Sequence, residues 1–148
     1  MATNTLPARA QSGLVPAITY GVAGGLVGGI VFGIMMQMMG AIPMVAMLVG
    51  SESVVVGWVV HLLISAVIGA VYGVVAARLP SSWGITLAAG VVNGIVWWVL
   101  GALILMPLML GMGEMVLRIE QMQINSLIGH VIFGVIAAAV FRTLYNRA

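Results

Sequence analysis

The chain has 148 residues, of which 63% are hydrophobic and only 5% are charged, and five arginines against three glutamates give it a net charge of +2. A soluble domain averages about 25% charged residues, so this composition excludes a soluble fold and predicts a protein of the lipid bilayer. With so few charges, the basic balance indicates membrane orientation and not nucleic-acid binding. The absence of cysteine excludes disulfides and thiolate metal sites.

The pattern of apolar runs predicts an all-α fold, a single polytopic membrane domain over 1–148 with four transmembrane helices. Residues 1–14 are polar and lack the apolar centre of a signal peptide, so they predict a cytoplasmic tail. Uncharged apolar runs of about 18 residues or more are long enough to cross the hydrocarbon core. Prolines 43 and 107 are expected to end the first and third runs. The predicted spans are 15–39, 53–77, 83–106 and 121–142.

The arginines predict how the spans are oriented. Four of the five fall on one side of a four-span chain, and Arg118 alone falls on the other. The positive-inside rule then places both termini in the cytoplasm and the 43–52 and 107–120 turns outside. We therefore expect a multi-pass protein of the cell (inner) membrane. The four arginines on the cytoplasmic side are Arg9, Arg78, Arg142 and Arg147.

The second half of the chain resembles the first. Glycines, a proline and an arginine return at nearly constant spacing, in the pairs Gly25–Gly90, Gly29–Gly94, Pro43–Pro107 and Arg78–Arg142. Each half then contains two spans. Because that number is even, we predict two parallel two-helix repeats related by a pseudo-twofold axis along the membrane normal.

Small residues four apart on one helix let neighbouring backbones approach closely. The first span carries such a series, which predicts close packing inside the bundle or along the interface of a homo-oligomer. Asn93 stands where the repeat has Gly28, so we expect it to face another helix and hydrogen-bond there. The glycines of the series are Gly21, Gly25, Gly29 and Gly33.

All eleven methionines after the initiator fall near the outer ends of the predicted spans. Thioethers are soft ligands that suit Cu(I), and Met35 and Met39 lie one helical turn apart. His61 and His130 lie within spans, where ionisable groups are expensive and often functional. Together they predict a metal site, or haem ligation by the two histidines. The simpler interpretation is that methionine fills irregular turns and that each histidine hydrogen-bonds across the bundle.

No catalytic constellation is present in the sequence, which has no pair of acids and no nucleophile beside a base. We therefore expect a protein that is not an enzyme.

Three segments resemble a family of small bacterial four-span membrane proteins without known activity. The segments are WVVHLLISAVIGAVYG (58–73), NGIVWWVLGALILMPLMLGMG (93–113) and SLIGHVIFGV (126–135). The resemblance implies a bacterial inner-membrane protein, and it implies no site residue.

Two classes of function stay open at this point. The leading hypothesis is a membrane protein that binds or conducts a soft metal ion such as Cu(I) through a Met/His cavity at its outer face. The alternatives are a non-catalytic structural subunit, whose glycine faces dock on partner membrane subunits, and a haem-binding membrane protein.

Overall fold

The computed structural model describes residues 13–146, and these residues form helices and turns with no strand among them. The first twelve residues of the predicted tail, Arg9 among them, lie outside the described residues, and so does Arg147. Four helices are long and apolar enough to cross a membrane, which confirms the all-α, four-span fold. They are α1 (Leu14–Met38), α3 (Val54–Ala76), the continuous helix formed by α4 (Trp83–Trp97), η1 (Trp98–Leu105) and α5 (Met106–Met109), and α6 (Gln121–Tyr145).

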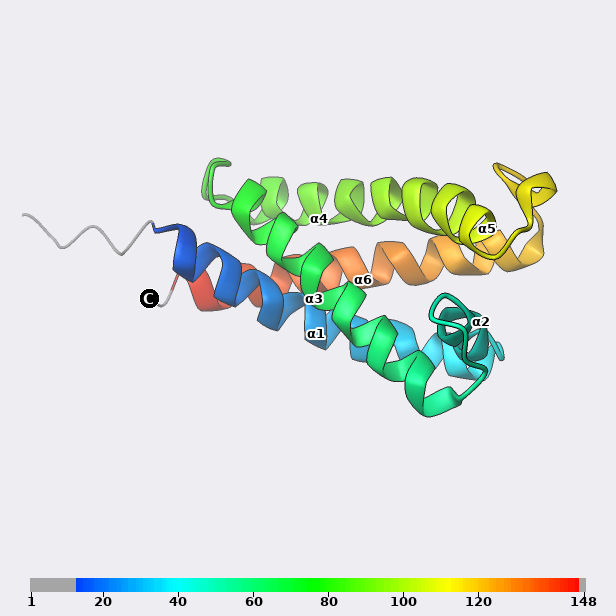
Figure 1. Cartoon of the computed structure of the whole chain (residues 1–148). Coiled ribbons are helices and arrows are strands. Elements are labelled where there is room, and N and C mark those ends of the chain that lie inside the picture. Colours follow the sequence, from blue (N-terminus) through cyan, green and yellow to red (C-terminus); the bar gives the residue numbers. More distant parts are fainter. Residues whose placement is uncertain (1–12, 147–148) are drawn as a thin grey trace, which may run out of the picture.

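The two ends of the bundle are formed by different segments of the chain (Figure 1). One end carries the short helices α2 (Ile42–Met47) and η2 (Gly113–Met115) together with α5. We call it the methionine end. The other carries the turn between α3 and α4, the start of α1 and the end of α6, and we call it the arginine end because Arg78 and Arg142 lie there.

Over part of their length, helices α1 and α3 are in direct backbone contact. A Cβ added to Gly25 would lie 2.8 Å from the Cα of Gly69, and one added to Gly21 would lie 3.0 Å from the Cα of Gly73. These distances are shorter than ordinary van der Waals contact. The glycines of both helices therefore let the two backbones meet directly.

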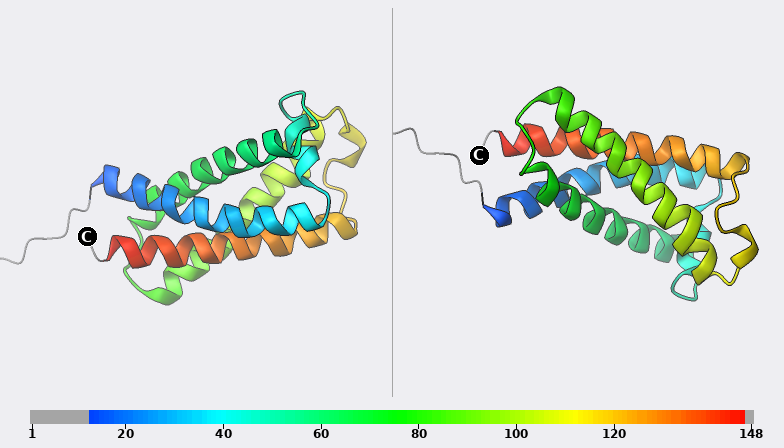
Figure 2. Two further views of the ribbon diagram at one scale, coloured as in Figure 1. Left: turned by 90° about the horizontal axis from the view of Figure 1, so that it is seen from below. Right: turned by 90° about the horizontal axis from the view of Figure 1, so that it is seen from above.

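A second set of glycines seats α6 against its neighbours. A Cβ on Gly28 of α1 would lie 2.8 Å from the carbonyl oxygen of Phe133, and one on Gly90 of α4 would lie 2.6 Å from the Cβ of Ala138. Helix α6 thus packs on α1 and on α4, and Figure 2 shows α1 and α6 side by side. In contrast, α3 and α4 touch little. They are joined near the arginine end, where the Tyr72 hydroxyl donates to the Thr86 carbonyl at 2.8 Å, and they diverge toward the methionine end (Figure 1).

The helix ends follow the local chemistry of the sequence. Ser53 and Ser82 are the N-caps of α3 and α4, and the side chain of each accepts a hydrogen bond from the backbone N–H three residues on. At the methionine end, three helices finish at glycines with positive φ, namely Gly40, Gly50 and Gly111. In each case the following N–H bonds a carbonyl five residues back, which satisfies one of the free carbonyls of the helix end.

The third span departs from the prediction at Pro107. We expected the helix to end there, but it continues to Met109. Residues 98–105 are wound as a π-helix, which is wider than an α-helix, directly before the proline. The missing proline N–H leaves the Leu103 carbonyl free, and the backbone N–H of Leu117 donates to it at 3.0 Å. This bond ties the loop after α5 back to the helix.

Candidate ligand-binding site

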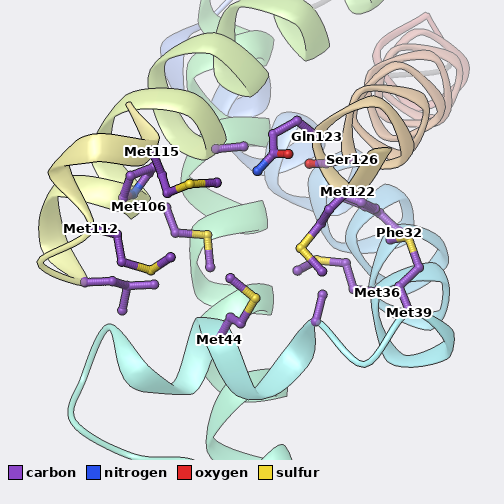
Figure 3. A pocket seen from close by; sticks show the side chains of 14 residues that line it. Phe32, Met36, Met39, Met44, Met106, Met112, Met115, Met122, Gln123 and Ser126 are labelled. Atoms are coloured by element: carbon purple, nitrogen blue, oxygen red, sulfur yellow. The ribbon is translucent and has the colours of Figure 1, made fainter. Parts of the chain in front are cut away.

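A pocket of about 90 Å³ opens at the methionine end, and seven of the fourteen residues that line it are methionines (Figure 3). In the figure, Met36 and Met122 approach from one side and Met106 and Met112 from the other, with Met44 rising from α2. The fold therefore brings together thioethers from the first, third and fourth spans and from the short segments between spans. We call this the methionine pocket, and its methionines are Met36, Met39, Met44, Met106, Met112, Met115 and Met122.

Only one of the two methionines predicted as ligands lines this pocket. Met39 does so, whereas Met35 lines neither of the two cavities described here and packs against the buried cluster of Phe32, Ile68 and Phe133. Successive residues on a helix point about 100° apart, so Met36 takes the place predicted for Met35. The spacing of the methionines predicted which helical turn of the first span borders the pocket, but not which residue of that turn faces it.

A second, larger cavity of about 320 Å³ lies deeper, where α3 and η1 diverge. Its wall is apolar except for His61 and Ser65 of α3 and Ser126 and His130 of α6. Both predicted histidines are therefore brought together, but in this histidine cavity and not in the methionine pocket. The two spaces adjoin, because five residues line both: Phe32, Met36, Ala102, Met106 and Ser126.

His61 bonds across the bundle. Its Nε2 lies 2.9 Å from the carbonyl oxygen of Gly29 in α1, and the ring is buried. A carbonyl oxygen only accepts hydrogen bonds, so Nε2 carries the proton and Nδ1 keeps the lone pair of the neutral ring. The contact depends on Gly29, because a side chain there would fall on Ser65, with its Cβ 2.6 Å from the Cβ of Ser65.

His130 bonds within its own helix. Its Nδ1 lies 2.8 Å from the carbonyl oxygen of Ser126 and 3.3 Å from the hydroxyl of the same residue. By the same reasoning Nδ1 carries the proton, and Nε2 keeps the lone pair. Each histidine thus has one nitrogen engaged with a carbonyl and one nitrogen available to a donor or a metal.

Both histidine rings contact the same phenylalanine. In the structure both rings pack edge-on against Phe32, at centroid distances of 5.6 Å for His61 and 4.7 Å for His130. The Phe32 ring therefore contacts both residues that were considered as haem ligands.

Asn93 does not make the hydrogen bond that we expected of its amide nitrogen. The Nδ2 atom is buried and has no partner among residues 13–146. The reason lies in the position of α4, which diverges from α3, whereas the corresponding glycine of α1 packs closely on α6.

The donor set around these cavities limits the metals that could bind. Over the part of the chain that the structure describes, no group of three or more His, Asp or Glu residues could hold a metal ion. A metal site here would therefore be built mainly of methionine sulfur.

Comparison of the chain with protein-family models, with curated proteins and with solved structures found no match in any of the three.

Proposed function

We propose that this protein binds a soft metal ion, such as Cu(I), in the methionine pocket. The observation that carries the proposal is the convergence of seven methionine side chains on one pocket of about 90 Å³. Thioether sulfur is an uncharged, soft ligand that suits Cu(I) and is a poor ligand for hard cations such as Mg²⁺. The proposal moves the site away from His61, His130 and Met35, and it keeps Met39.

The size and surroundings of the pocket fit an ion better than an organic molecule. Small-molecule pockets usually measure about 300 Å³ or more, several times the volume of this one. The three glutamates of the chain, Glu52, Glu114 and Glu120, all lie in the segments that connect the spans at the methionine end. The same segments contain a single arginine, Arg118. An excess of carboxylates near the mouth raises the local concentration of cations.

The structural-subunit alternative receives less support from the fold. That hypothesis used the glycine faces as docking surfaces for partner subunits or for a second copy. Gly21, Gly25 and Gly29 lie against α3, and Gly33 lies against Trp58 and His61. These faces are therefore occupied within the same chain, and a homo-oligomer would need a different surface.

We place the methionine end outside a bacterial inner membrane, with both termini in the cytoplasm. The distribution of arginine supports this orientation, because Arg78 and Arg142 lie at the arginine end and Arg118 at the opposite end. The inner membrane follows from the resemblance to bacterial four-span proteins. In this orientation the methionine pocket faces the extracytoplasmic side.

A twofold repeat is part of the same proposal. One residue offset relates Gly25 to Gly90 and also relates its contact Gly69 to Gly134. The same offset relates Ser65, beside Gly29, to His130, beside Gly94. The pairing of α1 with α3 thus resembles the pairing of α4 with α6, as two parallel two-helix repeats would require.

The experiment is competition for Ag(I), a redox-stable substitute for Cu(I), between purified protein and a chromophoric chelator. Replacing Met44 and Met122 by leucine keeps side-chain volume and removes two thioethers from different elements. We expect affinity to fall at least tenfold, which corresponds to about 1.4 kcal/mol.

The matched control replaces Met38 and Met47, which are exposed and line neither cavity, by leucine. This variant is expected to keep the wild-type affinity. The proposal is wrong if wild-type protein does not compete for Ag(I), or if the control variant loses as much affinity as the pocket variant.

A further inference from the structure

We propose that the histidine cavity binds an uncharged, lipid-soluble aromatic alcohol, a phenol or hydroquinol, which enters from the bilayer between α3 and η1. This site is separate from the metal site proposed above, and it takes a different class of ligand. The argument rests on the mouth of the cavity, on its wall and on the two ring nitrogens that face no protein donor.

The mouth of the cavity is apolar. Among its lining residues, Ile64 of α3, Leu105 of η1 and Met109 of α5 are exposed on the outside of the bundle. In a membrane this outside is hydrocarbon, and within the described spans the charged residues lie near the helix ends. A charged molecule would pay the cost of leaving water before reaching this entrance, whereas an uncharged apolar molecule is already dissolved beside it.

Five of the seventeen residues that line the cavity carry rings. Phe32 of α1, Trp97 at the end of α4 and Phe133 of α6 line it together with the two imidazoles. Phe32 already meets both imidazoles edge to face. Offset and edge-on contacts between rings are favourable beyond the burial of area, so this wall suits a flat aromatic ligand. The volume of about 320 Å³ is at the lower end of the range for small-molecule sites.

The polar groups of the cavity select a hydrogen-bond donor. The carbonyls of Gly29 and Ser126 hold the protons of His61 on Nε2 and of His130 on Nδ1. Within residues 13–146 neither of the other two ring nitrogens has a hydrogen-bond partner. A lone pair in an apolar space gains most from a ligand that brings an O–H group. A ketone or quinone carbonyl, which only accepts, would find no protein donor at these nitrogens.

The cavity also breaks the pseudo-symmetry of the bundle at a specific place. A twofold axis that exchanges α1 with α4 and α3 with α6 would make the contact between α3 and α4 equivalent to the contact between α1 and α6. The second is close along the helices, whereas the first is open toward the methionine end. In the open region η1 has Gly101 on the cavity wall, and no heavy atom lies within 4 Å of a Cβ added there.

The test measures binding of 2,6-diisopropylphenol and of its methyl ether to the full chain in lipid nanodiscs, by tryptophan fluorescence. Trp97 lines the cavity, so occupancy should change its emission, and Trp97→Phe should remove most of that change. The two compounds share shape and apolarity, but the ether has no O–H. We expect saturable binding of the phenol, at least fivefold tighter than that of the ether.

Variants separate the hydrogen bond from the apolar wall. Replacing both His61 and His130 by phenylalanine keeps rings in the cavity and removes both acceptors. It should weaken phenol binding at least fivefold and leave ether binding unchanged. Met39→Leu, which alters the methionine pocket but not this cavity, should leave both unchanged.

Two outcomes would overturn the proposal, and both are measured on the wild-type protein alone. Equal affinity for phenol and ether would show an apolar groove that takes acyl chains without selecting a donor. Absence of saturable binding for either compound would show that the cavity is not a ligand site.

Discussion

Gly25 shows what a single residue decides in this bundle. Because a Cβ there would lie 2.8 Å from the Cα of Gly69, replacement by alanine must push α1 away from α3. Overpacking of this kind costs about 1–3 kcal/mol. We expect Gly25→Ala to lower the free energy of unfolding by about that amount in detergent titrated with sodium dodecyl sulfate.

The matched control is the same substitution at Gly101, where an added Cβ meets nothing within 4 Å. Alanine is the better helix former by about 1 kcal/mol, so Gly101→Ala should leave stability unchanged or raise it slightly. If both variants unfold at the same denaturant concentration as the wild type, the close approach of α1 and α3 does not contribute to stability.

The roles of the glycines and methionines were predictable from the sequence, but the directions in which they point from their helices were only partly predictable. The glycine spacing predicted close packing on one face of the first span. It did not predict that Gly24 and Gly28 would serve a second face toward α6. Met35 was predicted as a ligand but does not line the methionine pocket, because the rotation of a helix about its axis is set by its neighbours. A membrane span is apolar on all sides, so its sequence contains little information about that rotation.

At the scale of helices and turns, the ends of the spans were the most predictable feature. Every spanning helix begins and ends within three residues of its prediction. Serine caps, glycine stops and charges act locally, so sequence alone reveals them. The π-helix over 98–105 was not predicted, since the Leu103 carbonyl that Pro107 leaves free is bonded by the N–H of Leu117, which is distant in sequence. That segment lines both cavities, so the shape of the candidate site could not be predicted from the sequence either.

Gly40 offers a test of the helix stops. Its φ of +69° lies in the left-handed region, and no heavy atom lies within 4 Å of an added Cβ. Alanine there would meet no clash but would carry the strain of a left-handed backbone, about 1–2 kcal/mol. We expect Gly40→Ala to lower the free energy of unfolding by that amount. Gly84→Ala, equally open but in the first turn of α4 without a positive φ, should not lower it. Equal effects at the two positions would contradict the role of Gly40 in ending α1.

At the scale of the whole molecule, composition and span length sufficed to predict a four-span all-α fold. Clustering of methionine at one end of the bundle also followed from the sequence, because it needs only the order of the spans. The histidine cavity did not, because it depends on the divergence of α3 from α4, and no local pattern in either helix indicates a crossing angle.

The orientation of the whole bundle is the last testable consequence, and under the proposed function it decides from which side of the membrane a metal ion would reach the methionine pocket. Because the chain has no cysteine, single cysteines can be introduced one at a time. Glu52 is exposed at the methionine end and Pro80 at the arginine end, and neither side chain makes a hydrogen bond that the bundle needs. In the proposed orientation, which places Arg78 and Arg142 at the inner face, a membrane-impermeant maleimide should label Glu52→Cys in intact cells. It should label Pro80→Cys only after the membrane is opened. The reverse pattern would place the methionine pocket in the cytoplasm. Labelling of both sites in intact cells would show insertion in two orientations, which this balance of arginines argues against.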